Sequence, residues 1–121
     1  VSQVFKGPLS GQLFETLVLG EVVRNFYNSG KIPRIFWWRT SSGQEVDFII
    51  EDRGKLIPIE VKLTTKSDPR IIKGLHSFCE IFRSRVKEAY LINLSTEKII
   101  LGEGILSLPF FKFVTDPLVK K

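Results

Sequence analysis

Two acidic residues and a lysine stand at spacings that would bring their side chains together: Asp47, Glu60 and Lys62. Each acid lies in a short apolar run typical of a β-strand, and residues 52–55 between the runs are typical of a hairpin loop. The register of that hairpin places Asp47 directly opposite Glu60, with Lys62 on the same face as Glu60. The sequence therefore predicts two acids and a lysine at one point of a sheet.

Like charges at opposed positions of a hairpin destabilise it, so this pairing requires a compensating group. A bound divalent cation is one, because Mg²⁺ takes oxygen ligands from one or two carboxylates together with water and phosphate. Two simpler alternatives remain open. Asp47 and Glu60 could each pair with a surface cation such as Lys62 or Arg39. Lys62 could also pair across the hairpin with Glu45, which the same register places opposite it.

A third acid, Glu15, lies in a segment whose apolar residues recur at helical spacing over residues 11–28. On that helix Glu15 is expected in the middle of an apolar stripe, where a carboxylate is rare unless it is paired or binds a metal. Glu15 is therefore a candidate third metal ligand. The alternatives are an ion pair with a nearby arginine and a position at the edge of the sheet.

Four further residues are candidates for contact with nucleic acid: Gln44, Lys66, Arg70 and Lys73. The three basic residues surround the start of a predicted helix, and a helix N-terminus itself favours a phosphate group. Gln44 lies in the turn before the strand of Asp47, where it could orient water or contact phosphate. The alternatives are a solvated basic face and an ordinary polar turn.

The elements that position these residues follow from apolar periodicity and turn residues. We expect Ser10 as the N-cap of the first helix and Gly30 as its stop. Three strands, a helix that begins at Pro69, and two more strands are expected to follow, the last two side by side. The predicted ranges are 11–28, 34–39, 43–51, 56–63, 69–82, 89–94 and 98–101.

A helix between the hairpin and the strand at 89–94 makes a crossover connection, which predicts a mixed sheet. Pro58 cannot donate to a ladder, so it is expected where no partner faces its nitrogen or at a bulge that shifts the register. The apolar tail after Leu101 is interrupted by Pro109 and Pro117 and is not assigned to an element.

The composition is that of one globular domain of 121 residues. No apolar run is long enough to cross a membrane and no signal-peptide pattern is present, so no membrane partner is expected. Cys79 is the only cysteine, which excludes a disulfide within the chain and favours a cytoplasmic protein. The net charge of +5 agrees with a polyanionic partner. Because the chain begins at Val1 and contains no Met, we expect a fragment of a longer protein.

An acid on a first helix, Asp47, a hairpin, Glu60-Val61-Lys62 and a second helix together resemble the PD-(D/E)xK nuclease superfamily. The segments 11–15, 37–40, 43–48 and 57–62 narrow this resemblance to the DUF4143 domain, which typically follows an AAA-type ATPase module. The resemblance implies an α/β domain over residues 1–121 with a restriction-endonuclease-like fold. Its mixed central sheet would be flanked by helices in the order α-β-β-β-α-β, carboxy-terminal to the ATPase.

The resemblance also implies a role for each candidate. Asp47 and Glu60 match the two metal-binding acids, and Lys62 matches the lysine that positions water or stabilises developing charge. Glu15 matches the helix acid found in many members. The carbonyl group of Val61 completes the implied site for Mg²⁺ or Mn²⁺.

The expected function is Mg²⁺-dependent hydrolysis of phosphodiester bonds in DNA, by a domain attached to an ATPase. The alternative is a catalytically silent module of the same fold that binds DNA or a protein partner. Trp37 and Trp38 alternate sides of a strand, so one is expected in the core, while the other could stack or pack on a neighbouring domain. These tryptophans and the apolar tail leave a homodimer open.

Overall fold

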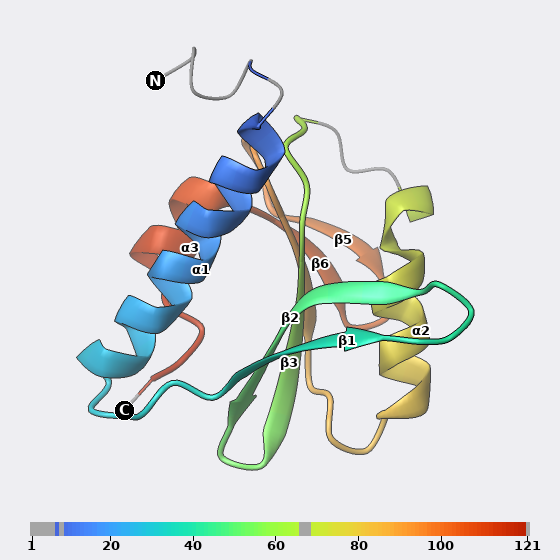
Figure 1. The fold of residues 1–121 in the computed structure, drawn as a ribbon, viewed down its shortest axis with the longest axis horizontal. Helices are drawn as coiled ribbons and strands as arrows, with labels where there is room; N and C mark the ends of the chain where they lie inside the picture. Colours follow the sequence, from blue (N-terminus) through green and yellow to red (C-terminus); the bar gives the residue numbers. More distant parts are fainter. Residues whose placement is uncertain (1–6, 8, 66–68, 121) are drawn as a thin grey trace.

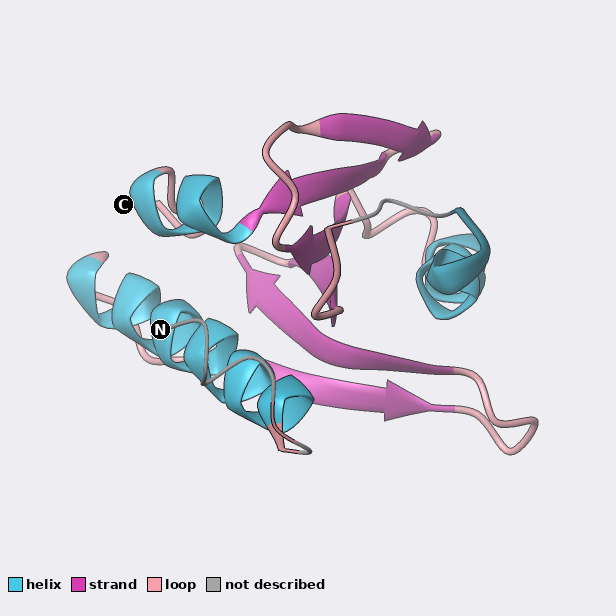
Figure 2. Ribbon diagram, turned by 90° about the horizontal axis from the view of Figure 1, so that it is seen from above, coloured by secondary structure: helices cyan, strands magenta, loops and turns pink. Residues whose placement is uncertain are grey.

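The computed structural model describes residues 7, 9–65 and 69–120. Within these residues, a six-stranded mixed sheet in the order β1-β2-β3-β4-β6-β5 lies between α1 and α3 on one face and α2 on the other (Figures 1 and 2). No helix in the described ranges is long and apolar enough to span a membrane. The elements are α1 (Ser10–Asn28), β1 (Ile35–Arg39), β2 (Glu45–Asp52), β3 (Lys55–Val61), η1 (Pro69–Ile72), α2 (Lys73–Ile81), β4 (Ala89–Asn93), β5 (Ile99–Gly102), β6 (Ile105–Pro109) and α3 (Phe110–Thr115).

Helix α1 packs on the sheet through one stripe of residues at four-residue intervals, because this spacing keeps side chains on one face of a helix. The predicted stop is confirmed: the helix ends at Asn28, and Gly30 has a φ of 73°, which glycine adopts without strain. The predicted N-cap is wrong by one residue, because Leu9 holds the cap position and Ser10 is already helical. The buried stripe comprises Phe14, Val18, Val22 and Phe26.

Strands β2 and β3 form the predicted hairpin, and Glu51 pairs with Leu56 as expected. The loop is shorter than predicted, because Asp52 also pairs with Lys55 and only residues 53–54 turn the chain. Both turn residues have positive φ, 54° and 78°, as a two-residue hairpin requires. The loop is shortened by one residue at each end, so the predicted register is unchanged.

Pro58 lies inside β3, paired with Ile49, and the described β2–β3 ladder has no shift at this point. The N–H of Leu56 donates to the carbonyl of Arg85, on the β4 side of β3. Because alternate residues direct their amides to the same side, the nitrogen of Pro58 also faces β4. There the described ladder begins only at Ile59, so the missing N–H removes no bond from it.

The crossover is confirmed, because β4 is parallel to β3 and follows α2. The short strand expected after it is present as β5, but its predicted position beside β4 is wrong. Strand β6, which comes from the unassigned tail, lies between them, parallel to β4 and antiparallel to β5. All five residues of β6 are buried, whereas Ile99 and Ile100 of β5 are exposed. Strand β6 therefore takes the inner position beside β4, and β5, which follows β4 in the sequence, takes the edge of the sheet.

Helix α2 makes a close backbone contact with β2. A Cβ atom on Gly74 would overlap the carbonyl oxygen of Glu45, so glycine is needed for this approach. Trp38 packs edge-on against Phe78 of α2, with ring centroids 5.3 Å apart. Trp37 is 75% exposed, which confirms that one tryptophan of the pair packs inside and the other does not.

The register of β1 against β2 shifts by one residue between Phe36 and Trp38. Trp37 therefore faces two residues of β2, Asp47 and Phe48, which is a β-bulge in β2. From the sequence, a bulge was expected only at Pro58, in the next strand, so the bulge in β2 was not predicted. The bulge in β2 includes Asp47, the first residue of the predicted metal site.

Candidate functional site

Asp47 and Glu60 lie where the two hairpin strands separate. The described ladder between them ends one pair earlier, at Phe48 with Ile59. Beyond it, each carboxylate accepts a backbone hydrogen bond from the opposite strand. The N–H of Val61 donates to Oδ2 of Asp47 at 2.7 Å, and the N–H of Asp47 donates to Oε1 of Glu60 at 3.2 Å. The predicted proximity of the two acids is confirmed.

The bulge interrupts the regular alternation of side chains along β2 at Asp47. Val46 and Ile49 are three residues apart, yet both pack in the core beneath α2, whereas Phe48 packs in the core beneath α1. In a regular strand, residues three apart point to opposite faces. The extra residue in β2 therefore breaks the alternation next to Asp47, whose carboxylate reaches across to the N–H of Val61.

Glu60 is an acid in a buried position, with only 7% of its surface exposed. Burial raises the pKa of Glu60 to about 8, and both the charge of Asp47 and a hydrogen bond to its carboxyl group add to this effect. Lys62 acts in the opposite direction, but its Nζ lies 3.8 Å from Oε2 of Glu60 and the side chain is 47% exposed. The pair of acids therefore holds a proton near neutral pH unless a cation takes its place.

Glu15 approaches this pair from α1. It lies at the border of the buried stripe, half-buried, rather than in its middle as predicted. Burial and the nearby Asp47 raise the pKa of Glu15, whereas Lys62 lowers it, so all three groups act on one another. Among the described residues, however, no three His, Cys, Asp or Glu side chains form a group that could hold a metal ion. The role of Glu15 as a third ligand stays a prediction.

Glu15 also lines a pocket of about 430 Å³ between α1 and β2. The other residues of this pocket are Gln12, Thr16, Leu19 and Phe48. The pocket thus combines one carboxylate with two polar and two apolar side chains, on the side of the sheet that carries α1.

Of the ion pairs that the sequence offered as alternatives to a metal site, one is present among the described residues and two are not. Lys62 does lie near Glu60. Arg39, in contrast, binds Glu45, with a distance of 2.8 Å from Nη2 to Oε2. Because Arg39 and Glu45 bind each other, two of the expected ion pairs are not formed: Arg39 with Asp47 or Glu60, and Glu45 with Lys62.

Two of the four nucleic-acid candidates are brought together. Gln44, before β2, and Lys73, the first residue of α2, line an open pocket of about 360 Å³. Lys66 and the side chain of Arg70 lie outside the part of the chain that the structure describes. The contact of these residues with nucleic acid stays a prediction.

A buried polar cluster at the carboxyl ends of β4 and β6 was missed by the sequence analysis. Nδ2 of Asn93 donates to Oγ of Ser107 at 3.0 Å, and Oγ of Ser95 donates to Oδ1 of Asn93 at 2.6 Å. Through the register, Glu60 pairs with Leu91, which pairs with Ser107, so the cluster adjoins the candidate site across the sheet. An asparagine inside an otherwise apolar strand was the available signal.

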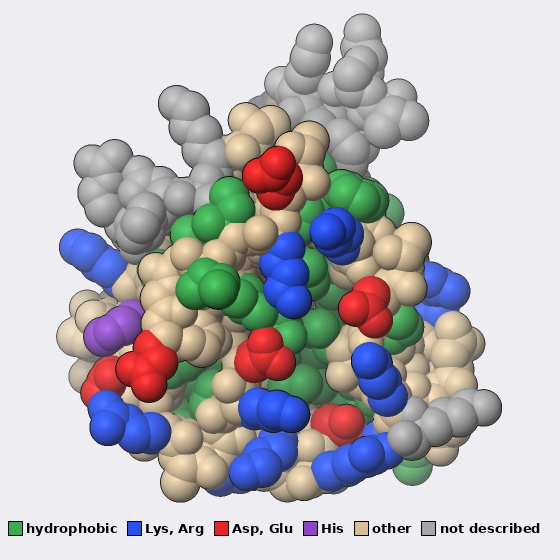
Figure 3. Space-filling view, turned by 180° about the vertical axis from the view of Figure 1, so that it is seen from behind, with side chains coloured by type: hydrophobic (Ala, Val, Ile, Leu, Met, Phe, Trp, Pro, Cys, Tyr) green, Lys and Arg blue, Asp and Glu red, His purple; other side chains and the backbone are tan. Residues whose placement is uncertain are grey.

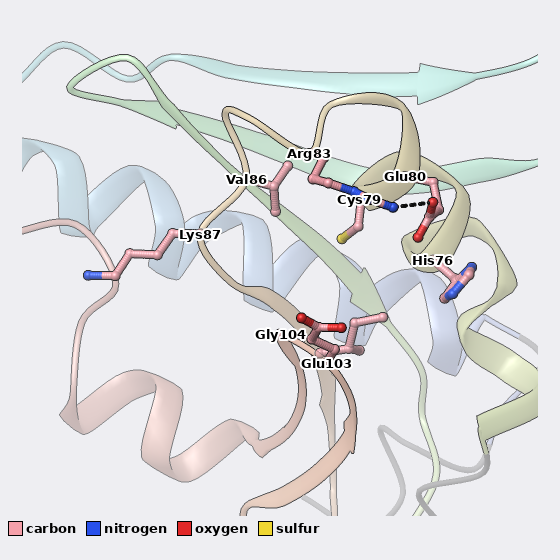
Figure 4. Close-up of a pocket in the computed structure, with 9 residues that line it drawn as sticks. His76, Cys79, Glu80, Arg83, Val86, Lys87, Glu103 and Gly104 are labelled. Atoms are coloured by element: carbon pink, nitrogen blue, oxygen red, sulfur yellow. Dashed lines mark hydrogen bonds and ion pairs between the residues drawn. The ribbon is translucent and has the colours of Figure 1, made fainter.

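A separate pocket of about 310 Å³ lies beside α2 (Figure 4). The charges of Arg83 and Glu80 in it compensate each other through an ion pair of 2.6 Å. Burial raises the pKa of Cys79 there, which disfavours the reactive thiolate. The lining residues are His76, Cys79, Glu80, Arg83, Val86, Lys87, Glu103, Gly104 and Ile105. This pocket therefore offers no activated group comparable with Glu60.

The net charge of the protein does not gather into one basic surface on the side opposite the view of Figure 1. There, Lys and Arg side chains are interspersed with Asp and Glu (Figure 3).

Comparison with known proteins assigns the chain to a family. Residues 10–113 match the family model described as Domain of unknown function (DUF4143). No curated protein and no solved structure matches the chain. The matched range contains both central acids, Lys62, Glu15 and all six described strands. The chain therefore belongs to the DUF4143 family.

Proposed function

We propose that this domain is a metal-dependent phosphodiesterase that acts on DNA, with Asp47, Glu60 and Lys62 in its active site. The observation that carries the proposal is the pair of adjacent carboxylates, one of them buried, which are held by reciprocal backbone bonds and have one lysine beside them. Perturbed acids in such an arrangement are typical of functional sites rather than of structural ion pairs.

The oxygen atoms of the site fit a hard divalent cation. The backbone bonds occupy one oxygen of Asp47 and one of Glu60. A cation would displace the proton that the two carboxyl groups share and would take their remaining oxygens as ligands. Mg²⁺ or Mn²⁺ would be held by these two acids, with Glu15 and the carbonyl group of Val61 as further expected ligands. When bound, the ion supplies an activated water and stabilises negative charge on the phosphate.

The chain itself supplies orientation and charge. The two backbone bonds hold the acids in place before substrate arrives, which lowers the entropy lost on reaction. Lys62 keeps its Nζ partly in solvent and 3.8 Å from Glu60, so it can donate to a phosphate oxygen or to water. Without a cation, Glu60 holds the proton that the buried pair requires.

We infer that the fold is restriction-endonuclease-like and that the domain works with an AAA-type ATPase. The element order α-β-β-β-α-β at the start of the chain and the position of both acids on the hairpin support the first part. The second part rests on the resemblance described above, since DUF4143 domains typically follow such a module.

The experiment is a cleavage assay with linear duplex, single-stranded and branched DNA in the presence of Mg²⁺ or Mn²⁺. Asp47→Asn should reduce the cleavage rate at least about a hundredfold, because it removes a charged ligand from the site. Glu80→Gln is the control, since it removes an exposed acid on α2 that pairs with Arg83 and not with the candidate site. The proposal is wrong if no DNA is cleaved, or if Asp47→Asn cleaves as fast as the unmodified protein.

A second candidate is a silent module that binds DNA or a protein partner for an attached ATPase. It is favoured by the finding that the described residues hold no group of three metal-binding side chains. The two candidates differ in their response to Mg²⁺. Only the enzyme should gain thermal stability from the ion in a manner that depends on Asp47 and Glu60.

A further inference from the structure

We propose that Trp37 is a stacking platform for an unpaired base, so that the substrate of the candidate active site contains single-stranded DNA. This inference rests on the proposed function, because it names the substrate class of the same site.

The exposure of Trp37 is the first observation. It is 75% exposed on β1, an edge strand, so no further strand of the described sheet covers it. Its neighbour Trp38 packs against Phe78 in the core beneath α2. A solvent-exposed indole is the largest flat apolar surface that a side chain can offer, and folding of this chain does not use it.

The second observation is the position of Trp37 relative to the carboxylates. It faces Asp47 and Phe48 across the bulge, and neighbouring strands lie about 5 Å apart. A base stacked on the indole would therefore place the sugar-phosphate backbone of its own nucleotide, or of the next one, at Asp47, the acid that Trp37 faces.

The third observation is the face on which Trp37 lies. Side chains alternate along β1, so Trp37 shares the face of Ile35, which packs on the core beneath α1. Phe48 belongs to the same core and also lines the pocket of Glu15, whose volume is about 430 Å³. The indole, the pocket and Glu15 thus lie on one side of the sheet.

The fourth observation supplies the charge that a polyanion requires. Arg39 lies two residues after Trp37, on the same face, with its side chain 65% exposed. Its ion pair with Glu45 is itself exposed, and such pairs contribute little stability. The guanidinium can therefore exchange Glu45 for a phosphate group, which it binds in a bidentate manner.

These features favour binding of an unpaired DNA strand over binding of a duplex. A base in a duplex has both faces covered by its neighbours, whereas an unpaired base can leave the stack and lie on an aromatic ring. Proteins that bind single strands combine aromatic side chains with a basic groove in this way. Flaps, junction arms and single-stranded ends all offer such bases.

The test uses the tryptophan content of the chain. There are two tryptophans, so Trp38→Phe leaves Trp37 as the only source of indole fluorescence. Titration of this variant with a thymidine oligonucleotide in EDTA should quench the fluorescence, because the base covers the indole. Trp37→Ala should weaken single-strand binding about tenfold or more and leave binding of a blunt duplex unchanged.

Phe36→Ala is the matched control, because it removes an exposed aromatic residue from the same strand but from the opposite face. Its affinity for the single strand should equal that of the unmodified protein. Equal affinity of Trp37→Ala and the unmodified protein, or absence of quenching at saturation, overturns the platform. The exposed indole would then be a contact surface for a protein.

Binding in EDTA is independent of turnover, which separates the two proposals. If the single strand binds through Trp37 but no DNA is cleaved with Mg²⁺, the nuclease proposal is wrong and the platform stands. If DNA is cleaved and Trp37→Ala changes neither binding nor cleavage of single strands, the platform is wrong and the nuclease proposal stands.

Discussion

The proton on Glu60 leads to a quantitative prediction about stability and pH. Burial and Asp47 raise the pKa of Glu60 from 4.5 to about 8 in the folded protein. Between these values the folded state binds a proton that the unfolded state has lost. The resulting stability is fully present below the unfolded pKa and is lost as the pH rises through the folded pKa, by about 1.4 kcal/mol per unit.

The perturbation is Glu60→Gln, which keeps an oxygen to accept the N–H of Asp47 but cannot titrate. Without metal ions, this variant should be close to the unmodified protein in stability at about pH 5, where Glu60 is protonated. At about pH 8 it should be more stable by several kcal/mol, because the unmodified protein then confines two adjacent negative charges.

The assay is urea unfolding in EDTA from pH 5 to pH 8, followed by tryptophan fluorescence, with Glu80→Gln as an exposed control. Addition of Mg²⁺ at pH 8 should then raise the free energy of unfolding of the unmodified protein by about 2.7 kcal/mol, at an ion concentration of a hundred times the Kd. The free energy of unfolding of Glu60→Gln should not change, because this variant lacks one charged ligand.

Parallel pH profiles for Glu60→Gln and the unmodified protein would refute this reasoning. So would a rise in the stability of the unmodified protein from pH 5 to pH 8 that Glu60→Gln abolishes. Either result would mean that Glu60 is ionised in the metal-free fold, and that the acids do not confine a proton.

Three further predictions concern the stability of the fold. Gly74→Ala should destabilise the fold by about 1–3 kcal/mol or more, because its Cβ would overlap the carbonyl oxygen of Glu45. Gly20→Ala, a helix position with nothing within 4 Å, should instead stabilise it by up to about 1 kcal/mol. Ser107→Ala should destabilise by about 1–3 kcal/mol, since Asn93 loses a buried hydrogen bond. Urea unfolding measures all three, and equal midpoints for the two glycine variants would contradict the contact at Gly74.

Much of the candidate site could be predicted from the sequence, because the hairpin is local. The turn at residues 53–54 fixes the register of β2 against β3, and strand periodicity then brings Asp47 to Glu60. The stop of α1 at Gly30 is equally local. The crossover could be predicted for a different reason, because a helix between two strands of one sheet implies a parallel connection. Residues close in sequence lose little entropy on pairing, so their own side chains decide the outcome.

Only the tertiary structure decided which strand lies beside β4. The predicted neighbour, β5, lies at the edge with two exposed isoleucines, whereas β6, whose five residues are all buried, lies beside β4. Which strand lies inside depends on how segments distant in the chain pack against the rest of the sheet, and the local sequence pattern of either strand does not reveal this. The same holds for Asn93, whose partner Ser107 comes from the segment left unassigned.

The sequence by itself determined that Asp47, Glu60 and Lys62 would meet on one hairpin, because strand period and turn chemistry are local properties. It did not determine the direction of Asp47. The bulge opposite Trp37 arises from the fit of β1 against β2 between two cores, one beneath each group of helices. That fit depends on the packing of the whole sheet, which places Asp47 within reach of Glu15 and leaves the indole of Trp37 in solvent.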